Sequence, residues 1–168
     1  VTTTELASRA IQGGARAIAF LAARLVGSVG SKVRLAQRTL SLLSASHDAG
    51  PGYAIDTRLR PSGSQGVLVT SFPSFVEYHR GSASWERQAL LRARPVAGDP
   101  ALRDTLQSAI ATIAYTRGPV DLGELRRLRA RMELELGRED RGAISLKYGR
   151  GGLVDVEFIA QALQMTYG

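Results

Sequence analysis

The stretch Gly52–Phe72, GYAIDTRLRPSGSQGVLVTSF, decides the fold that this sequence predicts. In its first half, apolar and charged side chains alternate, so that Asp56, Arg58 and Arg60 would share one face. Alternation with a period of two is typical of a strand, in which neighbours on one face lie roughly 7 Å apart. The segment Pro61–Gly66 has the composition of a turn, and an apolar run follows it. The stretch therefore predicts two strands joined by a glycine-containing loop.

The charged face of the first strand indicates a specific chemistry. A carboxylate at this spacing can hold a divalent cation while the adjacent guanidiniums bind the phosphates that the cation also touches. The turn adds hydroxyl and backbone donors at Ser62 and Gly63, which can form an anion-binding nest. Two plainer interpretations stay open: a solvent-facing ladder of Asp-Arg ion pairs, and a turn that only reverses the chain.

Most of the remaining chain has apolar residues at helical spacing. Several helices also have start and stop signals, because Asp99-Pro100 can begin one and Gly137 can end another. Ser84 would cap its helix, and Glu124 would complete a capping box with Asp121. The sequence predicts a kinked helix over Val1–Val26, a flexible joint at Gly27–Ser31, and helices over Val33–Leu43, from Pro73 to near Gly81, from Ser84 to Pro95, from Asp99 to Gly118, from Asp121 to Gly137, and over Leu153–Met165.

The segment Ala143–Lys147 is predicted to be a short strand, followed by the glycine-rich loop Tyr148–Gly152 and a helix N-terminus. Such an order can cradle a phosphate, with Lys147 supplying a point charge. The glycine spacing is not that of a dinucleotide-binding fingerprint. In the helix that follows, Asp155 and Glu157 are two residues apart and cannot share a face, so we assign them to structure or domain contact.

An arginine-rich arc is predicted on the exposed side of the helix over residues 121–137. It comprises Arg126, Arg127, Arg129 and Arg131. One interpretation is a solvated face whose arginines pair with neighbouring glutamates, and the other is a docking surface for an acidic partner. The residues alone leave both open.

The composition is that of a globular chain that attracts anions. The 168 residues carry a formal net charge of +7, and Lys32 and Lys147 are the only lysines among 22 basic residues. Arginine suits bidentate recognition, so nucleotides, nucleic acid or an acidic protein are compatible partners. Aromatic residues make up 6% and do not interleave with a basic cluster, which argues against a single-strand nucleic-acid platform. Because cysteine is absent and no apolar run approaches a membrane span, we expect a cytoplasmic protein without disulfides.

Three blocks of sequence begin at Ile55, Trp85 and Leu146: IDTRLRPSGSQGVLVTS, WERQALLRARPVAGD and LKYGRGGLVDVEFIAQ. In this order they resemble the glutamine synthetase adenylyltransferase family. Its members are large proteins with two similar nucleotidyltransferase halves, one attaching AMP to a tyrosine of glutamine synthetase and the other removing it. The combination of RLRPSG with VDVEFIAQ is more similar to the C-terminal, AMP-attaching half.

The resemblance implies an α+β fold: part of a nucleotidyltransferase domain of the DNA polymerase beta-like type, with a small mixed or antiparallel sheet surrounded by helices. Residues 1–98 would belong to that domain, and residues 99–168 to a helical extension with a short strand. The implied substrate is ATP, the cofactor is Mg²⁺, and the partners are glutamine synthetase and a nitrogen-signalling regulatory protein. Asp56 would be the catalytic residue that binds the metal, and the nucleotide would be contacted by Arg58, Arg60, Ser62, Gly63 and Lys147.

One element that the resemblance requires is missing. In this family a Gly-Ser pair is followed by an Asp-x-Asp pair, whose carboxylates join the later aspartate in holding two magnesium ions. No Asp-x-Asp occurs in the 168 residues, so the chain is expected to be a partial domain that is inactive by itself. The alternatives are a catalytically inactive interaction module of the same family and a basic nucleic-acid-binding domain.

Overall fold

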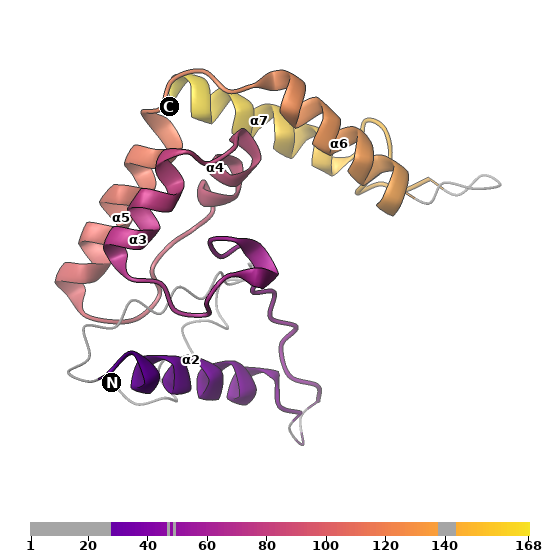
Figure 1. Cartoon of the computed structure of the whole chain (residues 1–168). Coiled ribbons are helices and arrows are strands. Elements are labelled where there is room, and N and C mark those ends of the chain that lie inside the picture. The colour runs from indigo at the N-terminus through magenta and orange to yellow at the C-terminus, as the bar shows by residue number, and fades with distance from the viewer. Residues whose placement is uncertain (1–27, 47, 49, 138–143) are drawn as a thin grey trace. The chain divides into compact units, whose positions relative to one another are not determined.

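A computed structural model of the chain describes residues 28–46, 48, 50–137 and 144–168 (Figure 1). The described elements are α2 (Val29–Ser44), the 3-10 turn η1 (Gly63–Gln65), α3 (Phe72–Arg80), α4 (Ser84–Leu90), α5 (Pro100–Tyr115), α6 (Leu122–Leu136) and α7 (Leu153–Tyr167). Because α2 begins at Val29, the flexible joint predicted at Gly27–Ser31 is wrong from that residue onward. The helix predicted over Val1–Val26 lies outside the described residues.

The chain folds into two compact units. The first extends to Arg80 and includes Ala93–Ala109, and the second comprises Gly81–Arg92 and Ile110–Gly168. Helix α5 begins in the first unit and ends in the second. The division into residues 1–98 and 99–168 that the sequence indicated stays a prediction.

Each unit has its own buried residues. In the first unit, Phe75 and Leu106 are each 3% exposed. In the second, α4, α6 and α7 contact one another, and Met165 is fully buried. Across the contact of α4 with α7, Gln88 Nε2 donates to Gln161 Oε1 at 2.8 Å, so this core includes a satisfied polar pair. Within the described part, no helix is both long and apolar enough to cross a membrane.

Local capping fixes the starts of α5 and α6 as predicted. Asp99 Oδ1 accepts the N–H of Leu102 at 3.0 Å, and Asp121 Oδ1 accepts the N–H of Glu124 at 3.0 Å. The predicted capping box is incomplete, because Glu124 Oε2 accepts the N–H of Ser84 at 3.1 Å instead. Ser84 is the first residue of α4 rather than its cap, and its Oγ accepts the N–H of Asp121 at 3.1 Å. These exchanged bonds join the starts of α4 and α6.

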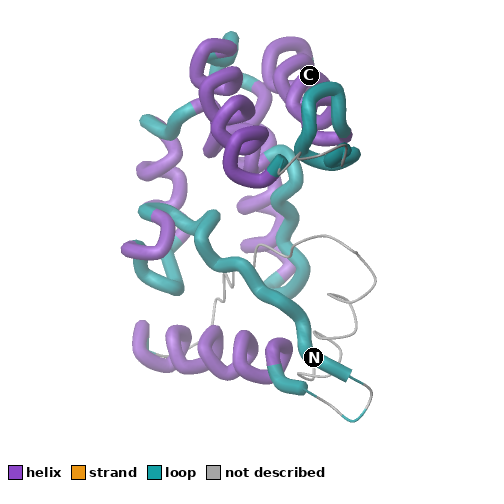
Figure 2. Tube along the Cα trace, turned by 90° about the vertical axis from the view of Figure 1, so that its right-hand side faces the viewer, coloured by secondary structure: helices purple, strands orange, loops and turns teal. Residues whose placement is uncertain are grey.

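The predicted α+β fold with a small mixed or antiparallel sheet is wrong for the described residues, which form helices and loops without a sheet (Figure 2). Residues 51–57 and 67–71 are irregular, and residues 58–66 form turns and η1. Exposure does not alternate either, since Tyr53 is 53% exposed and Leu59 is 38% exposed on the side expected to be buried. The strand predicted over Ala143–Lys147 is likewise absent over residues 144–147.

The physical reason is that a strand needs a neighbouring strand to satisfy its backbone, whereas this segment satisfies part of its backbone through an arginine side chain and the end of α2. Its turn carbonyls bond to an arginine side chain, and the N–H of Tyr53 donates to Leu43 O at 2.8 Å. Alternating charge in the sequence therefore reflects local bonding within a loop, not two faces of a sheet.

Candidate functional site

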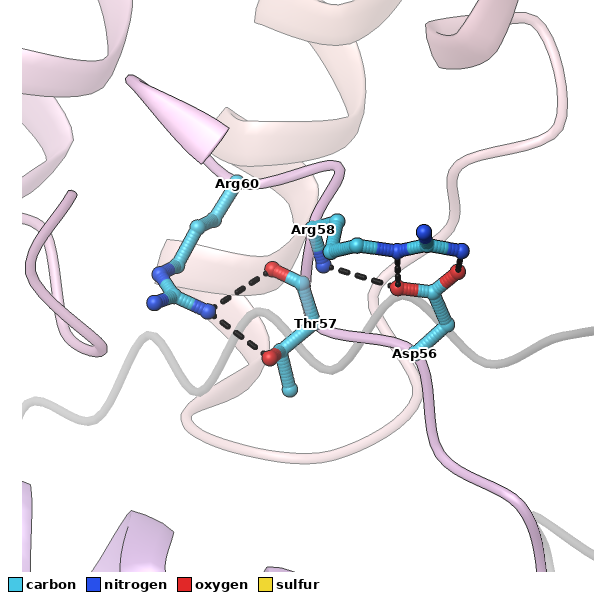
Figure 3. A network of polar contacts seen from close by, with 4 residues as sticks. All are labelled: Asp56, Thr57, Arg58 and Arg60. Atoms are coloured by element: carbon cyan, nitrogen blue, oxygen red, sulfur yellow. Dashed lines mark hydrogen bonds and ion pairs between the residues drawn. The ribbon is translucent and has the colours of Figure 1, made fainter. Parts of the chain in front are cut away.

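The loop over residues 56–66 is closed by the side chain of Arg60. Its Nε donates to Gly66 O at 3.0 Å, and its Nη2 donates to Ser64 O at 3.1 Å. Its Nη1 donates to both oxygens of Thr57, to the carbonyl at 2.9 Å and to Oγ1 at 2.7 Å (Figure 3). One guanidinium thus joins the start of the loop to its end. In this structure, the donors that the sequence assigned to phosphate are directed at the loop itself.

The turn at the centre of this loop needs unusual backbone conformations. Ser62 has φ 61° and Gly63 has φ 56°, both in the left-handed region, where a non-glycine residue is uncommon. Gly66 is required for a different reason, since a Cβ there would lie 1.9 Å from Pro61 O. The loop is therefore tightly specified by its sequence. The nucleotide-binding roles of Ser62 and Gly63 stay predictions.

Asp56 and Arg58 form a two-pronged ion pair at the start of the loop. Arg58 Nε donates to Asp56 Oδ1 at 3.0 Å, and Nη2 donates to Oδ2 at 2.8 Å (Figure 3). The backbone N–H of Arg58 also donates to Oδ1, at 3.0 Å. The bond to the carboxylate, and then its charge, raise the pKa of Arg58. The Arg58 side chain is 78% exposed, and its Nη1 has no acceptor among the described residues.

The described residues do not provide the donor set that two magnesium ions require. Within residues 28–46, 48, 50–137 and 144–168, no three His, Asp or Glu side chains come together in a metal-binding arrangement. Asp56 is the carboxylate assigned to metal, and both of its oxygens already accept bonds from Arg58. A carboxylate held this way must give up a charge-assisted pair before it can bind a cation.

The glycine-rich loop before α7 uses its amides internally. The N–H groups of Leu153 and Val154 donate to the carbonyls of Leu146 and Lys147, at 3.0 and 3.1 Å. The amides that a helix N-terminus would offer to a phosphate are here bonded to the preceding turn. Lys147 is exposed, and its assignment to the nucleotide stays a prediction.

This loop is held by a partly buried ion pair. Asp155 Oδ1 accepts from Arg129 Nε at 2.5 Å, and Oδ2 accepts the N–H of Gly151 at 2.6 Å. Arg129 Nη2 continues to Gly149 O at 2.8 Å. The hydrogen bond from Arg129 is the largest influence that lowers the pKa of Asp155, with smaller contributions from Gly151 N–H and nearby positive charge. Arg129 is only 8% exposed, so it does not belong to an exposed arginine arc.

Comparison with known proteins places these elements in a family. A family model described as glutamate-ammonia ligase adenylyltransferase matches residues 22–109, which include the whole Arg60-closed loop. The chain belongs to this adenylyltransferase family. The resemblance that the three sequence blocks indicated is therefore confirmed.

The curated relatives of this adenylyltransferase-family chain include several from Xanthomonas. Three are described as "Bifunctional glutamine synthetase adenylyltransferase/adenylyl-removing enzyme". Each aligns over 132 residues, from X. axonopodis pv. citri (strain 306) at 52% identity, X. campestris pv. campestris (strain B100) at 51% and X. oryzae pv. oryzae (strain MAFF 311018) at 50%. The alignments cover 77% of this chain and 14% of each relative, so the chain spans a small part of their length.

Sequence reasoning missed one prominent residue of this adenylyltransferase-family chain. Arg87 is 4% exposed, and its Nη2 donates to Gly118 O at 3.1 Å, to Ala114 O at 3.2 Å and to Met165 O at 3.5 Å. Burial, and then the nearby charge of Arg117, lower the pKa of Arg87. The cation thus lies at the C-terminal carbonyls of α5 and α7, where helix dipoles favour positive charge. No local pattern identifies this role, because all three acceptors are distant in sequence.

Proposed function

We propose that this chain is part of an enzyme that transfers AMP from ATP to a tyrosine of glutamine synthetase, in the AMP-attaching half of the protein. The observation that carries the proposal is the family match over residues 22–109. Identity of 50–52% to enzymes named for this activity supports it. In the proposed reaction the tyrosine oxygen forms a bond to the α-phosphorus, the bond to the bridging oxygen breaks, and pyrophosphate leaves.

Within this proposal, the Asp56–Arg58 pair and the Arg60-closed loop are the nucleotide-facing part of the chain. Arg58 is the residue best disposed to meet phosphate, since its Nη1 is open and its side chain is 78% exposed. Arg60 would act by holding the loop, so that Ser62 and Gly63 are presented in their left-handed conformations. Asp56 would bind metal only together with carboxylates beyond the described residues.

The proposal also includes finer assignments. Lys147 would contribute a second positive charge to the nucleotide, and a nitrogen-signalling protein would regulate the parent enzyme. Because ATP is the proposed substrate, we also propose a cytoplasmic location. These assignments rest on the family relationship.

ATP binding by the 168-residue chain tests the proposal. Titration calorimetry with ATP and magnesium should give saturable binding, and Arg58→Ala should weaken it by about threefold to tenfold, the range for one hydrogen bond or ion pair at an exposed site. The matched control is Arg80→Ala. Arg80 is 72% exposed and pairs with Glu77 at 2.6 Å within the same unit, so its loss should leave ATP binding unchanged. Equal affinity of the two variants would count against the site.

A second candidate function is an interaction module without catalysis. The specific observation in its favour is that both oxygens of Asp56 are engaged by Arg58, which leaves the proposed metal carboxylate closed. Immobilised glutamine synthetase separates the candidates. A module should bind glutamine synthetase equally with and without ATP, and it should show no ATP binding that depends on Arg58. The enzyme fragment should show ATP binding that depends on Arg58.

A further inference from the structure

An open groove with a volume of about 740 Å³ lies between α6 and α7, within the second unit. The two helices run alongside each other and provide nearly all of its walls (Figure 1). Its large apolar side chains are unusually exposed: Leu122 at 52%, Ile159 at 63%, Leu163 at 53% and Tyr167 at 81%. A contiguous apolar surface of this kind on a folded unit marks an interaction site.

Helix α7 exposes apolar side chains on the outer face, which is polar in an ordinary surface helix. Its buried residues are Val154, Gln161 and Met165, so an amide lies inside, where it bonds to Gln88. Bulky apolar side chains lie outside, and the segment 158–167 contains no charged residue. A helix with apolar residues on its outer face as well as its inner face is suited to being covered on both.

One of the two arginines that line the groove, Arg126, carries a positive charge that has no partner among the described residues. Asp155 is the only acidic residue lining it, and both of its oxygens are bonded to Arg129 or Gly151. Arg126 also lines it, is exposed, and makes no ion pair or hydrogen bond with a described residue. Arg129, in contrast, is buried and forms ion pairs with Asp155 and, at 3.6 Å through Nη1, with Glu133. An occupant with a carboxylate beside an apolar stripe would complement the guanidinium of Arg126.

We propose that this groove binds an acidic amphipathic helix of a partner protein, with its apolar stripe against α7 and a carboxylate on Arg126. The 15 residues of α7 give a track about 22 Å long, which matches helix-in-groove recognition through anchors at i, i+3, i+4 and i+7. A small molecule usually buries about 70–90% of its surface, which walls this open do not allow. The inference is independent of the proposed function, because none of the residues of the Arg60-closed loop lines the groove.

A designed peptide tests the proposal. The probe is a fluorescein-labelled, side-chain-stapled helix of about 18 residues with a leucine stripe flanked by glutamates, and its counterpart has lysine in place of every glutamate. Fluorescence anisotropy with the full chain should show saturable binding of the glutamate peptide and at least about tenfold weaker binding of the lysine peptide. Arg126→Glu should reverse this preference while leaving the helical circular dichroism unchanged.

The apolar contribution has its own matched pair of variants. Leu163→Asp should weaken binding of the glutamate peptide by at least about tenfold, as expected for a central anchor. Leu42→Asp is the control, because Leu42 is 56% exposed on α2 and lies outside the groove, and it should change binding less than about twofold.

Several results would overturn the proposal: no saturable binding up to about 1 mM peptide, equal binding of both peptides, or equal effects of the two leucine variants. A dimer in sedimentation that Leu163→Asp dissociates would assign the groove to a second copy and also overturn it. The same holds for binding to phosphatidylcholine vesicles that Leu163→Asp abolishes, which would assign the face to a lipid surface.

Discussion

Asp155→Asn should destabilise the second unit strongly, although it changes only a few atoms. Asp155 accepts from Arg129 at 2.5 Å and from the N–H of Gly151 at 2.6 Å, so one carboxylate joins α6, the glycine-rich loop and α7. Removing one member of a buried ion pair costs about 3–5 kcal/mol, because the other charge is left buried. The Arg129 side chain is 9% exposed but that of Asp155 is 29% exposed, so solvent lowers the expected cost to about 2–3 kcal/mol.

Urea denaturation followed by tryptophan fluorescence measures this cost. Trp85 is the only tryptophan and lies in α4, so its emission reports on the unit that contains Asp155. With a slope of about 1 kcal/mol per M for a small unit, the midpoint should fall by about 2–3 M. Glu157→Gln is the matched control on the same helix. Its pair with Arg92 spans 3.7 Å between side chains that are 52% and 67% exposed, so the loss should be below about 0.5 kcal/mol.

The pH dependence of the stability difference between the unaltered chain and Asp155→Asn gives a second check. The fold lowers the pKa of Asp155 below its ordinary value of 3.8, so the folded state favours the charged carboxylate. Its contribution to stability is fully present above that ordinary value and is lost as pH falls through the folded pKa. The loss of unfolding free energy caused by Asp155→Asn should therefore have its full size at pH 7 and become smaller below about pH 4. A variant as stable as Glu157→Gln at pH 7, or a deficit unchanged at about pH 2.5, would refute the reasoning.

Three further outcomes are expected. Gly66→Ala should lower the melting temperature measured by helical circular dichroism, because the added Cβ would lie 1.9 Å from Pro61 O. The added Cβ of Gly81→Ala meets nothing within 4 Å, so this control should be neutral, and similar melting of both variants would contradict the prediction. Arg87→Met should cost about 2 kcal/mol or more in the Trp85 urea assay, since three carbonyls, two of them buried, lose their donor. A loss below about 0.5 kcal/mol would dismiss the capping role. The chain alone should not transfer labelled AMP to glutamine synthetase, because it lacks the Asp-x-Asp carboxylates of a two-ion site; transfer above a no-protein control that Asp56→Ala abolishes would disprove this.

The helices could be predicted from sequence where their signals are local. Asp99 caps α5 through the N–H of a residue three positions later, and the same spacing works for Asp121 at α6. Such bonds depend on a few neighbouring residues, so pattern and geometry agree. Glu124 shows where this ends. Its spacing fits a capping box, yet its carboxylate accepts from Ser84, 40 residues earlier. That choice depends on tertiary packing, which no local pattern contains.

The family could be identified from sequence because three blocks in fixed order are a long-range signal that needs no structure. The buried charges could not be predicted in the same way. The spacing of Arg129 predicts that it lies on the exposed arc with the other arginines. It is instead buried in the second unit by hydrogen bonds to Asp155 and Gly149, which lie 26 and 20 residues away. Arg87 is similar, since its acceptors lie 27 to 78 residues away. A buried arginine is thus decided by acceptors that the local sequence does not identify.

The hairpin prediction for Gly52–Phe72 failed because one sequence pattern has two physical solutions. Alternating charged and apolar residues favour a strand only when a neighbouring strand accepts and donates the ladder bonds. Here Arg58 lies two residues after Asp56 and donates hydrogen bonds to its carboxylate. Arg60 donates to the carbonyls of Thr57, Ser64 and Gly66. These bonds satisfy the turn from inside, and the left-handed Ser62 and Gly63 let it close. The residues chosen from sequence for their chemistry are therefore the ones that shape the loop, so substituting Arg60 changes the geometry of the proposed site together with its charge.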